Sequence, residues 1–199
     1  QMCIRDSTNA SPLTRLVWAG GVGQTILTLK PVDPNPSVRD TQIQDLELSD
    51  LSIDGGGVKG NTNVGAAIGL LLDRVTNSRF RRVEIRNMKD GGGIGIRLTT
   101  TGNEFGMNTD WNLFDRCAVL LASVCVSVTG EDVNQQANSC HNTFIGLTAS
   151  YWATNAEDGG IRLGYCDNNA FYDTFIFQHG LDNGNLGLGR GVVVDDARF

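Results

Sequence analysis

The chain repeats a short pattern in which a large apolar residue is followed by apolar or small residues three and five positions later. Thr174, at the first of these positions in the last copy, is the exception. The copies begin at Leu48, Phe80, Phe114, Phe144 and Phe171, with spacings of 32, 34, 30 and 27 residues. Repeats of this length indicate a solenoid, in which each unit buries its apolar face against its neighbours.

A second apolar segment belongs to each unit. Residues 68–72, 94–98, 124–128, 161–163 and 192–194 alternate with a period of two, and 25–29 fits the unit of Leu48. No helical period is sustained, and 25 glycines with only four prolines favour turns and strands. We therefore expect an all-β, single-stranded parallel β-helix of about six rungs. In this fold the Phe residues form one stack, and Asn112, Asn142 and Asn169, each two positions before a Phe, form a turn ladder, with Asn77 in the unit of Phe80.

The charges support this register. Aligning the repeats places Glu47 beside Arg79, Asp50 beside Arg82, Asp54 beside Arg86 and Asp115 beside Arg81. We interpret these arginines as members of solvated cross-strand pairs, in preference to a site that grips an acidic polymer.

Composition excludes some partners and bounds the domain. The net charge of −6 argues against a nucleic-acid partner, and the absence of an 18-residue apolar run argues against a membrane span. Residues 1–15 are interpreted as a non-native or disordered segment, and 16–199 as the β-helix domain. Because Phe199 falls where the next repeat would open, we expect the domain to be truncated at its C-terminus.

Three stretches, "DLELSDLSIDGGG", "GLLLDRVTNSRFRRVEIRNMKDGGGIGIRL" and "DGGIRLGYCDNNAFYDTFIF", resemble the pectate-lyase-like right-handed parallel β-helix superfamily. Within it they are most similar to the pectate-lyase-3 type of domain found in phage tailspikes and environmental polysaccharide-active proteins. The resemblance implies a right-handed coil and an extracellular or virion-surface protein that binds polysaccharide and, as an enzyme, is a lyase or glycoside hydrolase. The alternative is a non-catalytic shaft or trimer-forming stalk.

Two long loops on neighbouring rungs, 99–113 and 129–143, are the first candidates for a site. Glycoside hydrolysis needs two carboxylates, and an exposed Trp provides a stacking surface for a sugar ring. The catalytic candidates are Glu104, Asp110, Glu131 and Asp132; the substrate-binding candidates are Trp111, His141, Tyr151 and Trp152. The alternative is that the loop residues are merely solvated and that Tyr151 and Trp152 pack a corner.

No cofactor is expected. The five cysteines lack the spacing of a zinc site. The one candidate for a metal is the segment 182–191, whose Asp and Asn residues offer oxygen ligands of the kind that bind Ca²⁺. The fragments "NTD", "HG" and "DD" are similar to polygalacturonase motifs but occur in another order, so no catalytic role is transferred from them.

Overall fold

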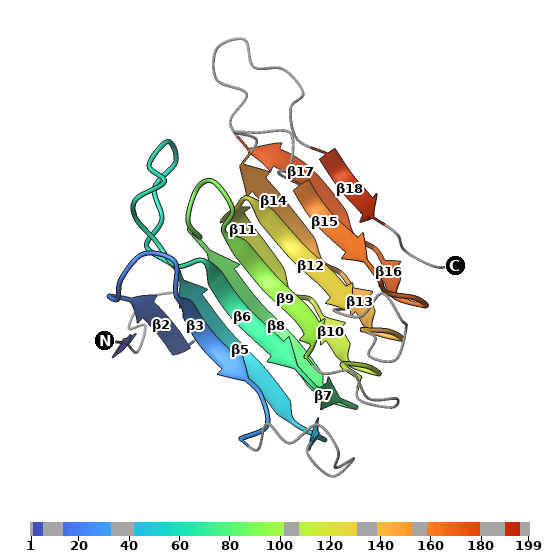
Figure 1. Ribbon diagram of the computed structural model, residues 1–199. Coiled ribbons are helices and arrows are strands. Elements are labelled where there is room, and N and C mark those ends of the chain that lie inside the picture. The colour runs from blue at the N-terminus through green and yellow to red at the C-terminus, as the bar shows by residue number, and fades with distance from the viewer. Residues whose placement is uncertain are drawn as a thin grey trace.

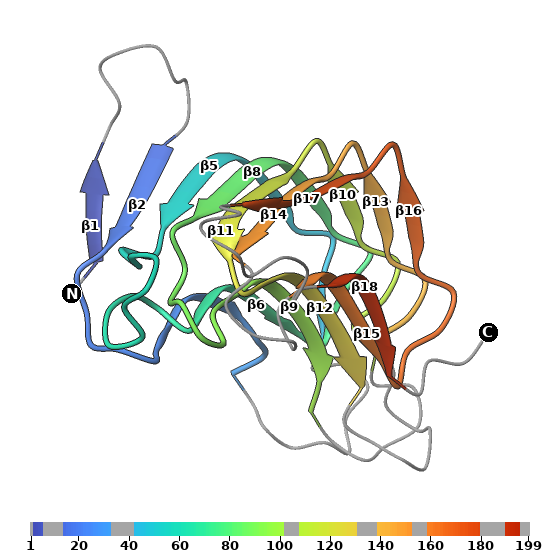
Figure 2. The ribbon, with the colours of Figure 1, turned by 90° about the horizontal axis from the view of Figure 1, so that it is seen from above.

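The computed structural model describes residues 2–5, 14–32, 42–101, 108–130, 139–152, 159–179 and 190–195. These residues form a parallel β-solenoid of about four turns and contain no helix (Figures 1 and 2). Accordingly, no helix in the described ranges could span a membrane. The predicted fold class is confirmed, while the predicted right-handed coil stays a prediction.

One flat side of the solenoid is a six-stranded parallel sheet, with one strand before each of the five repeat copies and a sixth after the last copy, so the second apolar segments are strands as predicted. Figure 2 shows this sheet facing the other sheet across the core. Its strands are β3 (Thr25–Leu29), β6 (Ile68–Asp73), β9 (Ile94–Thr100), β12 (Val124–Gly130), β15 (Gly159–Gly164) and β18 (Arg190–Asp195).

The opposite side is a ten-stranded sheet that contains the five repeat copies. The copies form β5 (Glu47–Asp54), β8 (Arg79–Arg86), β10 (Leu113–Asp115) with β11 (Ala118–Ala122), β13 (Thr143–Ile145) with β14 (Thr148–Trp152), and β16 (Ala170–Tyr172) with β17 (Phe175–His179). We number rungs 1 to 5 after these copies, starting at Leu48. A two-stranded sheet, β4 (Ile43–Gln44) with β7 (Val75–Thr76), lies at the corner before the first two copies.

The ten-stranded sheet begins with an antiparallel pair. β1 (Met2–Arg5) pairs with β2 (Thr14–Trp18), and β2 pairs in parallel with β5. Met2–Arg5 is therefore a strand within residues 1–15, which the sequence indicated to be non-native or disordered. The proposed division of the chain at residue 16 stays a prediction.

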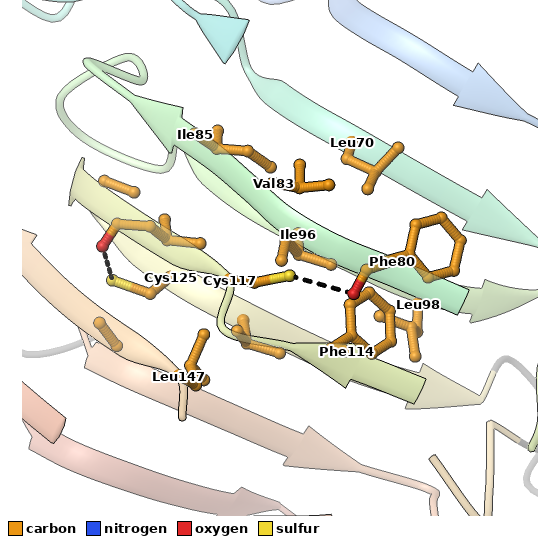
Figure 3. Close-up of a cluster of buried hydrophobic side chains, with 14 of the residues drawn as sticks. Leu70, Phe80, Val83, Ile85, Ile96, Leu98, Phe114, Cys117, Cys125 and Leu147 are labelled. Atoms are coloured by element: carbon orange, nitrogen blue, oxygen red, sulfur yellow. Dashed lines mark hydrogen bonds between the residues drawn. The ribbon is translucent and has the colours of Figure 1, made fainter. Parts of the chain in front are cut away.

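The phenylalanines form the predicted stack in the core. Ring centroids are 4.7 Å apart for Phe80 and Phe114, 4.3 Å for Phe114 and Phe144, and 4.7 Å for Phe144 and Phe171, with planes within 13° of parallel. Figure 3 shows Phe80 and Phe114 beside aliphatic side chains from both sheets, such as Leu98 of β9. Rings at this spacing gain both apolar burial and stacking.

The asparagines form the predicted turn ladder. Asn112 Nδ2 donates to Asn142 Oδ1 over 2.9 Å, and Asn142 Nδ2 donates to Asn169 Oδ1 over 3.0 Å. Asn112 and Asn142 are buried, and their amides also bond to main-chain atoms of adjacent rungs. On rung 2 this position belongs to Ser78, whose N–H donates to Asn112 Oδ1, so the inclusion of Asn77 in the ladder was wrong.

The charge register is confirmed, and two of its predicted ion pairs form. Arg82 binds both carboxylate oxygens of Asp50, at 2.6 and 2.5 Å, and Arg81 Nε lies 3.3 Å from Asp115 Oδ2. Glu47 lies opposite Arg79 on the neighbouring strand.

The ion pair predicted between Asp54 and Arg86 is wrong, although their backbones are in register. Arg86 pairs with Glu84 on its own strand. The Asp54 carboxylate accepts hydrogen bonds from Arg15, the Asn87 amide and the Gly56 N–H. Burial raises the pKa of Asp54, but these hydrogen bonds outweigh it and hold the pKa below its usual range.

Replacing Asn142 by Ala should lower the free energy of unfolding by about 2–4 kcal/mol, because the buried Asn112 N–H and Thr109 carbonyl, and the side-chain amides of Asn112 and Asn169, lose hydrogen bonds. Urea unfolding followed by circular dichroism measures this. Thr143→Ala, half-buried at the next position, is the matched control and should cost less than about 1 kcal/mol. Equal losses for the two variants would show that the ladder does not stabilise the fold.

Asp54 should make the free energy of unfolding depend on pH in the acidic range. Because its pKa is lower in the folded chain, its contribution is complete above about pH 4 and is lost as the pH falls through the folded pKa. Asp54→Asn, which cannot titrate, should cost about 1–3 kcal/mol at neutral pH and flatten the decline on the acid side. Asp50→Asn is the control and should change stability less, because Asp50 belongs to a solvent-exposed ion pair. The measurement is the urea midpoint of each variant across the pH range. If the midpoint of Asp54→Asn falls as steeply in acid as that of the wild type, this assignment is wrong.

Candidate functional site

A ladder of left-handed residues runs along the corner that precedes the repeat copies. Each member lies three positions before the large apolar residue of its rung and has a φ between 49° and 56°. The members are Asp45 (55°), Asn77 (49°), Trp111 (56°), His141 (54°) and Asn168 (50°). Asp and Asn tolerate this conformation, whereas a bulky residue pays roughly 1–2 kcal/mol for it. Trp111 and His141 are the bulky members of this ladder, and Trp111 calls for an explanation because its ring is also exposed.

Main-chain bonds from the adjacent rungs hold the corner in this conformation. The Asn77 N–H donates to the Asp110 carbonyl at 3.1 Å, the Asp110 N–H donates to the Val75 carbonyl at 3.2 Å, and the His141 N–H donates to the Asp167 carbonyl at 3.3 Å. A strained conformation persists where the surroundings fix it in this way. The direction of the Trp111 side chain is thus set by the rungs beside it.

The Trp111 ring is exposed and rests on a second ring. Its side chain is 62% exposed, and its centroid lies 4.5 Å from that of His141 with planes 5° apart. His141 is half-buried, and its Nδ1 has no hydrogen-bond partner among the described residues. The stack leaves the indole as a rigid surface that faces solvent.

An open groove of about 310 Å³ lies against Trp111. It is lined by residues of rungs 1, 2 and 3, namely Asp45, Leu46, Glu47, Asn77, Ser78, Arg79, Trp111 and Leu113. Asn77 Nδ2 donates to Asp45 Oδ1 within it. Because His141 belongs to rung 4, the groove occupies the opposite side of the indole. The groove thus combines one aromatic face with two carboxylates, a guanidinium and an amide.

Asp110, predicted as a catalytic residue, is half-buried next to this groove. Thr76 Oγ1 donates to its Oδ1 at 2.6 Å, and Asn108 Nδ2 donates to its Oδ2 at 3.3 Å. Through these contacts and its main-chain bonds, Asp110 anchors the turn that carries Trp111. Its catalytic role stays a prediction.

The other predicted site residues divide into two groups. Tyr151 and Trp152, on β14, are 5% and 2% exposed, so neither presents a ring face to a sugar; both pack the corner, the alternative that the sequence left open. Glu104, Glu131 and Asp132 lie outside the described residues, as does most of the calcium candidate 182–191. The structure therefore brings together Asp110, Trp111 and His141.

Sequence reasoning missed the groove residues Asp45, Glu47, Asn77 and Arg79. It searched the long loops, whereas these residues lie in short links between strands. The signal in the sequence was the repeat itself. Trp111 lies three positions before Phe114, and the residues three positions before Leu48 and Phe80 are Asp45 and Asn77. The predicted neighbours Glu47 and Arg79 follow two positions later in their rungs.

The cysteine beside the stack is not a nucleophile. Burial, together with the negative charges of Asp167 and Asp110, raises the pKa of Cys140 to about 12, so its thiol stays protonated at neutral pH. Within the described ranges, no three His, Cys, Asp or Glu side chains are arranged to hold a metal ion. The chemistry available in the groove is that of carboxylates, a guanidinium, an amide and an aromatic face.

Comparison of the chain with protein-family models, with curated proteins and with solved structures finds no match. The resemblance to the pectate-lyase-like superfamily therefore stays a prediction. The structure establishes a parallel β-solenoid, a fold that is compatible with proteins directed at carbohydrate.

Proposed function

We propose that this chain binds a polysaccharide in the groove beside Trp111. The observation that carries the proposal is an exposed indole, held in a costly backbone conformation and backed by a parallel His141 ring. A pyranose presents a face of C–H groups that packs on an aromatic ring, and a ring fixed in advance loses little entropy on binding. Exposure of such a ring has no benefit for the fold itself.

The polar lining of the groove supports a ligand rich in hydroxyl groups. Asp45 and Glu47 supply acceptors, Arg79 supplies donors, and Asn77 supplies both. Since two carboxylates stand against one guanidinium, the groove favours an uncharged glycan over a polymer of uronic acids. The resemblance noted above extends the proposal to an extracellular or cell-surface polymer and to a protein of a virion surface, such as a phage tailspike.

The alternative, a structural shaft or stalk, predicts an apolar stripe across rungs on the outer face of a sheet. On the six-stranded sheet, Leu71 and Val193 share an outward ladder but are separated by Arg97, Ser127 and Arg162. An observation in favour of a protein contact is the pair Phe175 and Phe177 on β17, which are 70% and 46% exposed. Among the described residues, the positions opposite this pair on rung 4 are Thr148 and Ser150, so the pair is not part of an apolar stripe there, and we favour polysaccharide binding.

Trp111→Ala should weaken binding at least tenfold, about 1.4 kcal/mol, to the polymers that the wild type retains from an array of neutral and acidic polysaccharides. Affinity electrophoresis followed by calorimetry measures this, and Trp111→Phe should keep most of the affinity. Tyr172→Ala is the matched control, because Tyr172 on β16 is 58% exposed but lies outside the groove. Unchanged affinity in Trp111→Ala, or an equal loss in Tyr172→Ala, would refute the groove as the binding site.

The carboxylates decide whether binding leads to cleavage. Hydrolysis in this groove requires that Asp45→Asn or Glu47→Gln abolish reducing-end release while binding is retained. If release survives both changes but is lost in Glu104→Gln, Asp110→Asn, Glu131→Gln or Asp132→Asn, the catalytic site lies with the residues first predicted. If the wild type releases no reducing ends and forms no unsaturated product, the groove serves binding alone.

A further inference from the structure

We propose that the glycan crosses the solenoid axis at Trp111, instead of running along it, and that the groove therefore binds a short stretch of a polymer with equatorial linkages. This inference rests on the proposed function. It concerns the direction of the bound chain and the class of linkage, which the binding proposal leaves open.

The first step is the orientation of the indole. Trp111 and His141 hold the same position on adjacent rungs, and parallel rungs follow one another along the axis at roughly 4.7–4.9 Å. Their centroids are 4.5 Å apart and their planes nearly parallel, so the line between the rings follows the axis. The flat faces of both rings are therefore turned along the axis, as in the phenylalanine stack inside.

The second step is that a single face of the indole is available. His141 covers the face toward rung 4, and the groove adjoins the face toward rungs 1 and 2. The next position of the ladder is Asn77, whose short side chain is bonded to Asp45 and has no ring. A pyranose that packs on Trp111 above Asn77 would become the third ring of the stack.

The third step follows from sugar geometry. A pyranose stacked on Trp111 has its ring plane perpendicular to the axis. Equatorial glycosidic bonds point outward from the ring, close to the ring plane. The neighbouring sugars therefore extend sideways and soon leave the ladder of left-handed residues. Asn168, beyond His141 on the same ladder, stays out of reach, whereas a chain running along the axis would pass over it.

The test uses cello-oligosaccharides of two to six residues, with malto-oligosaccharides of the same lengths as a control that differs in linkage alone. For the cello series, affinity should rise up to the trisaccharide and then change by less than about twofold. Asn168→Gly, which keeps the left-handed backbone, should bind the hexasaccharide as the wild type does, and Trp111→Ala should bind it at least tenfold more weakly.

The outcomes separate the two proposals. An increase of about tenfold or more from the trisaccharide to the hexasaccharide, or weaker binding in Asn168→Gly, would show a chain that follows the axis. Malto-oligosaccharides that bind as tightly as the cello series, or cello-oligosaccharides that do not bind while a polymer with axial linkages does so through Trp111, would overturn the assigned linkage and leave polysaccharide binding intact. If Trp111→Ala binds every tested glycan as tightly as the wild type does, the proposed function itself is wrong.

Discussion

The fold depends on register between adjacent rungs. Parallel strands place equivalent residues of neighbouring rungs side by side, but backbone pairing alone fixes a register only weakly. The amides of Asn112 and Asn142, which are buried, and of Asn169, which is half-buried, remove this freedom, because their donors and acceptors are satisfied only when each Asn meets the next. The phenylalanine rings reinforce the same register, since each packs flat on its neighbour. Once the Asn and Phe positions coincide, the positions between and beside them coincide as well.

The corner that carries Trp111 follows directly from this register. The left-handed residue of each rung immediately precedes the ladder of Ser78 and the asparagines, so its backbone is fixed by bonds that belong to the core. Its side chain, in contrast, points away from the core. The corner therefore accepts residues as different as Asp45 and Trp111 without changing the interior. A binding surface can thus vary on one side of a ladder while the other side stays constant.

This separation explains what the sequence could reveal. The strands, the phenylalanine stack and the Asn ladder were predictable, because each satisfies one condition that recurs on every rung. The place of Ser78 in the ladder was missed because its hydroxyl accepts the N–H of Leu46, as an Asn amide oxygen accepts the corresponding N–H on later rungs. The partner of Arg86 was missed because register sets backbone neighbours, and a long side chain then selects Glu84. Tyr151 and Trp152 were predicted to bind substrate, but β14 continues through both beyond the irregularity at Leu121 of β11, and they are buried. The groove itself was least predictable, since it forms from short links of three rungs that only stacking brings together.

The energetics of the corner favour a functional interpretation of Trp111 over a structural one. At the same position Asp45, Asn77 and Asn168 adopt the left-handed backbone at little cost, so a residue of that kind would have served the fold better. Packing offsets this cost only in part, because the indole is largely exposed and its contact with His141 covers one face. A contact of this type contributes about 0.5–1.5 kcal/mol, comparable to the roughly 1–2 kcal/mol that the conformation costs. Since stability gains nothing from the exposed face, a ligand that covers this face is the simplest physical reason for a tryptophan at this position.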